Sequence, residues 1–177
     1  MEISLKTVID SIKYSVDFKK NRLLPENHQI DWLPVIQCGD DGYSMGILEN
    51  GGWAIEGGRG LFELNHPCQF FLVMVLMEQP FDTVYSQLKV YFRSIGLETN
   101  VYDLFPFGLV VKAGFEQGSE YWAKLAFDWY QELPQEIKIS LVDSLANIVT
   151  AKWASQKLRQ KAKKETRRIE QQQNNNR

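Results

Sequence analysis

Phosphate binding is the first chemistry that this sequence suggests. Residues 51–60 read GGWAIEGGRG, and a glycine-rich backbone lets N–H groups approach a phosphate closely. The segment lacks the Gly-Lys-Ser/Thr ending of a P-loop, however, and it is not a G-x-G-x-x-G turn between a strand and a helix. We interpret its glycines as residues of turns and bulges, and we keep Arg59 as the side chain here that could contact an anion.

Nucleophilic catalysis is the second chemistry to consider, because a cysteine paired with a histidine can act as a nucleophile. His66 lies two residues before Cys68, but side chains that close together point in different directions on a helix or strand. Cys68 also opens an apolar run, where a cysteine is usually a small core residue. We expect the other histidine, His28, to lie in a polar loop over residues 21–29. The sequence therefore predicts no catalytic residue and leans against an enzyme, although a site assembled from remote residues leaves no such signal.

Carboxylates near the glycine-rich segment could act as acid and base or hold a divalent ion. The candidates are Asp40 and Asp41, with Glu56 or Glu63 as a second group. We favour another interpretation, in which Asp-Asp-Gly at residues 40–42 forms a turn and an aspartate bonds its own backbone. The further carboxylates of an EF-hand are absent, and the cysteines lack metal-ligand spacing. The sequence predicts no metal and no cofactor.

Aromatic residues are dense between positions 121 and 130, which suggests a core, a base-stacking platform or a contact for a partner protein. Trp122 and Trp129 share one helical face, which we assign to the core. Tyr121 and Phe127 lie off that stripe. If their rings are exposed, they become candidates for binding a partner.

The charge of the chain is divided unevenly along its length. Residues 150–177 hold nine Lys or Arg against two Glu, a net charge of +7, whereas residues 1–149 hold eleven basic and twenty acidic residues, a net charge of −9. Blocks of one sign usually form interaction tails or solvated faces, and an acidic body disfavours phosphate. Any polyanion would therefore have to bind the C-terminal segment.

The C-terminal segment reads as a basic helix with a thin apolar seam. At 100° per residue its apolar side chains fall within about 40° of one another, and the basic ones spread over the other ~200°. Such a helix can enter a groove of a partner, rest on an anionic membrane, bind nucleic acid, or fold against its own acidic body. The partner-binding candidates on this helix are Lys157, Leu158, Lys161, Lys164, Arg168 and Ile169.

The N-terminal third predicts one helix and then a small sheet. Apolar residues recur at three- and four-residue steps from Ile3 to Lys20, the period of an amphipathic helix. Eight of the twelve glycines lie between Gly39 and Gly60, and the apolar pieces between them are of strand length. Asn50-Gly51 is a strong signal for a type I′ hairpin turn. We expect an antiparallel meander over about residues 32–64.

The middle of the chain predicts helices, with one ambiguous segment. Residues 69–77 are apolar on every side, and we favour a helix over a strand because Asn65 and Pro67 resemble a helix start. A clear helical stripe follows from Phe81 to Ile95. Prolines and glycines then interrupt residues 98–116, which suggests a second hairpin with its strand at about residues 107–113.

The C-terminal third predicts a helix that begins after Ser119 and another that begins at Pro134. No glycine or proline follows Pro134, so residues 135–170 could form one helix about 54 Å long. A helix of that length exceeds a small body, and we expect its end to project as an arm. Its last residues, 171–177, form a polar tail of low complexity.

The chain as a whole is therefore expected to be an α+β protein rich in helices. Its 177 residues suggest one compact acidic body, residues 1–149, and a basic helical extension, residues 150–177. The longest apolar run has eight residues, against the ~20 of a transmembrane helix, and the N-terminus lacks a secretory signal. Two distant cysteines suggest a reducing compartment, so we expect a cytoplasmic protein without a transmembrane segment.

The function that these features favour is that of a non-catalytic interaction protein, an accessory, adaptor or regulatory subunit of a larger assembly. It would contact a partner protein through its C-terminal helix and an aromatic surface. The alternative is a nucleic-acid or ribonucleoprotein accessory protein anchored by residues 150–177.

Overall fold

The computed structural model describes residues 5–39 and 43–175, and it confirms an α+β fold rich in helices. The chain forms two compact units, Met1–Pro106, here the barrel unit, and Phe107–Arg177, here the helical unit. The predicted division into an acidic body, residues 1–149, and a basic extension concerns which part folds independently, and it stays a prediction.

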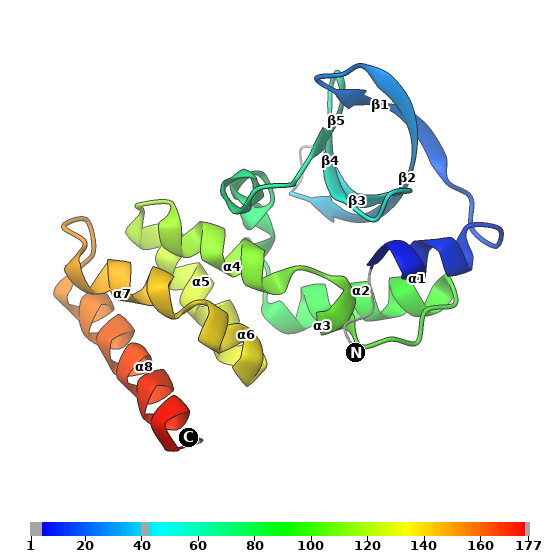
Figure 1. The fold of residues 1–177 in the computed structure, drawn as a ribbon. Coiled ribbons are helices and arrows are strands. Elements are labelled where there is room, and N and C mark those ends of the chain that lie inside the picture. Colours follow the sequence, from blue (N-terminus) through cyan, green and yellow to red (C-terminus); the bar gives the residue numbers. More distant parts are fainter. Residues whose placement is uncertain (1–4, 40–42, 176–177) are drawn as a thin grey trace. The chain divides into compact units, whose positions relative to one another are not determined.

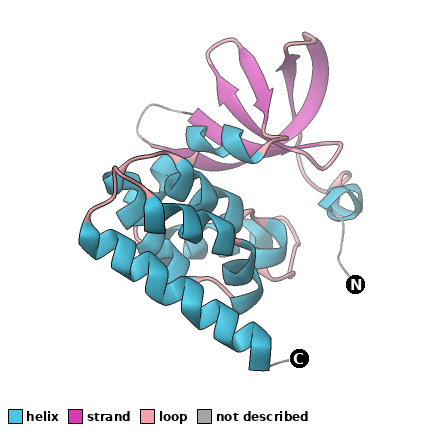
Figure 2. Ribbon diagram, turned by 60° about the vertical axis from the view of Figure 1, so that its left-hand side comes forward, coloured by secondary structure: helices cyan, strands magenta, loops and turns pink. Residues whose placement is uncertain are grey.

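Five strands form a closed barrel in the barrel unit (Figures 1 and 2). Each strand pairs with the next in antiparallel fashion, as the sequence predicts for a meander. Because the number of strands is odd, the first and last run in the same direction, and the pair that closes the barrel is parallel, with Leu23 opposite Leu61. The strands are β1 (Lys19–Leu24), β2 (His28–Cys38), β3 (Tyr43–Leu48), β4 (Trp53–Gly57) and β5 (Gly60–Glu63).

The barrel is larger than the predicted meander because β1 and the start of β2, including His28, lie where the sequence predicts the end of a helix and then a polar loop. Helix α1 spans only Leu5–Ile12, and the chain turns before Lys19 begins β1. The helical prediction up to Lys20 is therefore wrong. Local periodicity could not reveal that β1 is needed to close the sheet, since closure depends on β5, more than thirty residues later.

Two glycines permit the close approaches that the barrel requires. A Cβ atom on Gly46 would lie 2.7 Å from the ring of the buried Trp32, which fills the interior, and a Cβ on Gly60 would lie 2.6 Å from the carbonyl oxygen of Arg22 on β1. Gly60 also has φ of +148°, which disfavours a side chain. The buried interior cluster contains Leu23, Ile30, Trp32, Leu48, Ala54 and Leu61.

Helix α1 packs on the turn between β3 and β4. Lys6 donates hydrogen bonds from Nζ to Asp10 (2.7 Å) and to the carbonyl oxygen of Glu49 (3.0 Å). The turn at Asn50-Gly51 is present, but only Gly51, with φ of 88°, has a positive φ, so the turn is not of type I′. The buried side chains of α1 are Val8, Ile9 and Ile12.

The ambiguous apolar segment is helical, as the sequence favoured. It forms two short 3₁₀ helices, η1 (Pro67–Leu72) and η2 (Met74–Glu78), and the residue before η1 is His66 rather than Asn65. The predicted helix after it is confirmed as α2 (Phe81–Ser94). The hydroxyl group of Tyr91 on α2 donates to the carbonyl oxygen of Pro34 at 2.6 Å, which ties α2 to the barrel.

The predicted second hairpin is wrong, because residues 98–116 contain two helices. These are α3 (Val101–Leu104), capped by the side chain of Asn100, and α4 (Phe107–Glu116). The valines and glycines of α4 favour other structures locally, but its apolar side chains are buried within the helical unit, and that packing outweighs propensity. Gly108 allows the close approach of α6, since a Cβ there would lie 2.9 Å from Ile137.

The prediction of a single long C-terminal helix is also wrong, because the segment forms the separate helices α6, α7 and α8 (Figure 1). The helical conformation is interrupted at Leu141 and again at residues 151–155, although neither place has a glycine or proline. At the second break, Ser155 caps the last helix by accepting a hydrogen bond from the N–H of Leu158. The helical unit comprises α4, α5 (Glu120–Glu132), α6 (Gln135–Ser140), α7 (Val142–Thr150) and α8 (Gln156–Asn175).

Replacing Gly60 with alanine should lower the free energy of unfolding by about 1–3 kcal/mol, because the added Cβ would strain the pair of strands that closes the barrel. Urea denaturation followed by circular dichroism measures the change. The matched control is Gly58→Ala in the same turn, where a Cβ would meet no atom within 4 Å, and it should change stability by less than about 0.5 kcal/mol. Equal effects of the two substitutions would contradict this account of closure.

Candidate binding surface

Helix α8 has two faces of opposite character. Leu158 and Ile169 are only 4% and 2% exposed, so the predicted apolar seam is covered within the helical unit. At about 100° per residue, the centre of the basic arc lies on the opposite side of the helix. The exposed basic residues of that side, here the cationic face, are Lys157, Lys161, Lys163, Lys164, Arg167 and Arg168.

The helix is held along its length, so the expectation of a projecting arm is corrected. Near its start, the carboxylate of Glu120 on α5 accepts a hydrogen bond from the N–H of Ser155 at 3.0 Å. Farther along, the ammonium group of Lys161 lies 4.6 Å from the ring centre of Phe127. Towards its end, Gln135 of α6 donates to Gln172 at 2.6 Å. Helix α8 also packs on α7.

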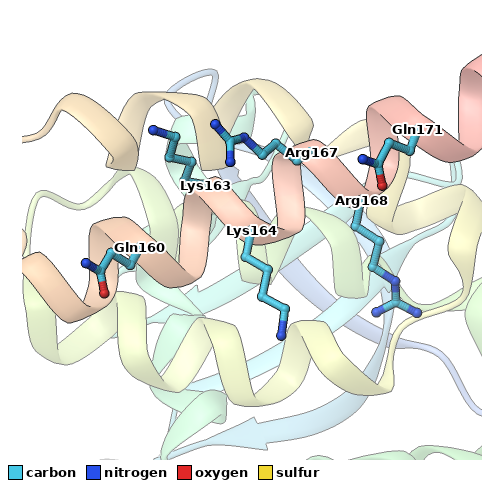
Figure 3. A pocket seen from close by; sticks show the side chains of 6 residues that line it. All are labelled: Gln160, Lys163, Lys164, Arg167, Arg168 and Gln171. Atoms are coloured by element: carbon cyan, nitrogen blue, oxygen red, sulfur yellow. The ribbon is translucent and has the colours of Figure 1, made fainter.

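The cationic face includes a surface recess of about 520 Å³, lined only by side chains of α8 (Figure 3). Figure 3 shows Lys163 and Arg167 extending from one edge of the α8 ribbon and Lys164 and Arg168 from the other. The exposed Arg168 lies 3.8 Å from the carboxylate of Glu165, whose side chain is largely covered. Four cationic groups thus line one exposed strip, with Gln160 and Gln171 at its ends.

A second recess, of about 340 Å³, lies between α5 and the first turns of α8. The carboxylate of Glu120 on its rim pairs with Lys124 at 2.8 Å and also accepts from Ser155. These two hydrogen bonds hold the pKa of Glu120 below its ordinary value. Because Phe127 and Leu158 also line this recess, we assign it to the attachment of α8.

The two predicted aromatic candidates do not form one exposed patch. Tyr121 is 55% exposed, whereas Phe127 is fully buried and contacts Phe115 and Lys161. The expected burial of Trp129 is confirmed, and its ring lies 6.1 Å from that of Phe107.

Sequence reasoning missed Trp153, which is 36% exposed in the turn before α8. The position that a Cβ on Gly118 would take lies 4.0 Å from its Nε1 atom. The hydrogen bond between Glu120 and Ser155 brings the start of α5 to the same turn. Tyr121 and Trp153 therefore lie at the same end of α8. The available signal was a tryptophan among small residues immediately before a polar helix.

The candidates of the barrel unit are dispersed. Arg59 is exposed in the turn between β4 and β5, and its role as an anion contact stays a prediction. Cys68 is exposed, so its expected place in the core is wrong; the buried cysteine is Cys38, and burial raises its thiol pKa to about 12. Glu56 accepts a hydrogen bond from Asn21 at 2.9 Å. The expected turn at residues 40–42 lies outside the described residues.

Residues 5–39 and 43–175 contain no group of three or more His, Cys, Asp or Glu side chains that could hold a metal ion. In the same described parts of the chain, no helix is both long and apolar enough to span a bilayer. Comparisons with protein-family models, curated proteins and solved structures find no match to this chain.

Replacing Leu158 with alanine should lower the free energy of unfolding by about 2–5 kcal/mol, because its side chain is buried between α8 and the rest of the helical unit. Chemical denaturation measures the loss. The matched control, Lys164→Ala on the exposed side of the same helix, should change stability by less than about 0.5 kcal/mol. If both variants are equally stable, the seam does not hold the helix.

The attachment of α8 should weaken in acid. The pKa of Glu120 is lowered in the folded state, so its stabilising contribution is present above the ordinary value of 4.5 and disappears as the pH falls through the lower folded value. Glu120→Gln should therefore lower the melting temperature at pH 7, and the difference from the natural chain should shrink below pH 4.5. Asp128→Asn, an exposed change on the same helix, is the control. A difference that does not vary with pH would contradict the assigned role.

Proposed function

We propose that this chain is a non-catalytic interaction protein, an accessory, adaptor or regulatory subunit of a larger assembly, and that its contact surface is the cationic face of α8. The observation that supports this most directly is the division of α8 into a buried seam and an exposed basic side. We also propose a cytoplasmic location.

The burial of the seam changes which partner chemistry the proposal favours. A groove that accepts Leu158 and Ile169 would have to compete with the chain's own helical unit, which already covers both residues. The basic side chains remain accessible, and their neighbours on the helix are also basic or uncharged over most of the face. Such a surface attracts an anionic partner and steers its approach.

A partner protein with an acidic surface is the first candidate. The helical unit has twelve basic and eight acidic residues, whereas the barrel unit has eight basic and fourteen acidic. This separation would orient an acidic partner toward the helical unit.

A nucleic-acid or ribonucleoprotein accessory role is the second candidate, and it uses the same face. Lys157, Lys161, Lys164 and Arg168 follow one another at steps of three or four residues and span about 17 Å along the helix. A regular row of cations can neutralise successive phosphates and release their counterions.

Affinity capture from the native host tests the proposal by comparing the natural chain with a variant that lacks four of the basic charges. The natural chain should retain a stoichiometric partner that is lost from the four-glutamine variant, in which Lys163, Lys164, Arg167 and Arg168 are replaced by Gln. The partner should then bind again as a purified component, with an affinity that falls as the salt concentration rises.

The barrel control variant carries the same loss of four charges on exposed residues of the other unit: Lys19, Lys20, Lys89 and Arg93, each changed to Gln. It should retain the partner. Loss of the partner from both variants would show an effect of net charge alone, and retention by both would refute the cationic face as the contact surface.

A further inference from the structure

We infer that the cationic face of α8 and the exposed rings of Trp153 and Tyr121 at its N-terminal end form one binding surface for single-stranded nucleic acid. The inference rests on the proposed function, since it uses the same face, and it adds the class of partner and two residues on which bases would stack. Its basis is that exposed aromatic rings lie at the turn that begins α8, and that exposed cations follow from Lys157 to Arg168 along the same helix.

The cations supply the attraction for the phosphate backbone. Six exposed basic side chains lie within twelve residues of α8, a stretch of helix about 17 Å long, so positive charge is concentrated on this face. They repel one another, and the single charge of Glu165, 3.8 Å from Arg168, offsets only part of six positive charges. A chain of phosphates relieves that repulsion, and the counterions that it releases favour binding.

The aromatic rings distinguish nucleic acid from an acidic protein. Tyr121 is 55% and Trp153 36% exposed, and the contacts of Glu120 and Gly118 bring both residues to the turn where α8 begins. Bases of a single strand stack on exposed aromatic side chains, and stacking tolerates any sequence because every base has a π face. A row of cations beside such rings is the combination that single-strand binding surfaces use.

The exposed rings favour a single strand over duplex DNA. The bases of a duplex are paired and already stacked on one another, so Trp153 and Tyr121 cannot stack on them without opening the duplex. The bases of a flexible single strand are free to stack on both rings.

Fluorescence anisotropy with the full chain tests the inference. The probes are labelled 20-nucleotide oligo(U) and oligo(dT), a 20-base-pair DNA duplex and a poly-glutamate peptide. We expect tighter binding to one or both single strands than to the duplex or the peptide, and the preference between oligo(U) and oligo(dT) separates RNA from DNA. With about five phosphate contacts, affinity should fall about a hundredfold between 50 and 200 mM salt.

The variants separate charge from stacking. The four-glutamine variant should make the log–log salt dependence shallower by about 3, at about 0.7 per lost contact. Trp153→Ala and Tyr121→Ala should each weaken single-strand binding by roughly tenfold with the salt dependence unchanged, and Trp153→Phe should restore most of the loss. The matched aromatic control is Tyr14→Ala, a residue 98% exposed in the barrel unit, which should have no effect.

Three outcomes would overturn the inference. Single-strand binding that is unaffected by both aromatic substitutions would reduce the surface to electrostatics. Equal or tighter binding of the duplex would contradict the argument from base stacking. Binding of poly-glutamate but of no oligonucleotide would assign the face to an acidic protein, and the accessory role would then stand without this inference, whereas retention of the native partner by the four-glutamine variant would remove both.

Discussion

The burial of the apolar seam of α8 is the contact on which the character of the helical unit depends. Leu158, Ala162 and Ile169 need cover from water, and α8 obtains it by lying on its own unit. Because the basic side chains occupy the opposite side of the helix, the same contact turns them outward as a continuous strip. Hydrophobic packing thus decides where the charge of the protein is displayed.

The barrel unit follows a different constraint, the closure of a sheet with an odd number of strands. The parallel pair of β1 and β5 joins segments that are distant in sequence, and Gly60 supplies the space that the approach needs. Closure leaves no free strand edge in the barrel as described, so the sheet is protected from pairing with other chains. The acidic excess of this unit repels anions, so it does not attract an anionic partner of the kind that we propose for the helical unit.

The two units therefore differ in what they offer to a partner. In the barrel unit the chemically suggestive residues are dispersed, and Glu56 is engaged by Asn21. In the helical unit, charge and exposed aromatic rings gather around one helix. The turn before α8 connects the charged helix with the aromatic rings. The hydrogen bond between Glu120 and Ser155 holds the start of α8, and Gly118 lies close to Trp153 in the same turn.

The sequence by itself determined the features that depend on local periodicity and charge: α2, α5, the glycine-rich strands, and a basic helix with its seam opposite its cations. Only the tertiary structure decided what covers the seam, because a helical period shows that a face is apolar but not which surface meets it. The same limit explains the other errors. Residues 107–116 form a helix because of their packing within the helical unit. Lys19 belongs to a strand because β1 pairs with the distant β5. The last helix begins where Ser155, whose N–H donates to Glu120, caps it, although no glycine or proline marks that position.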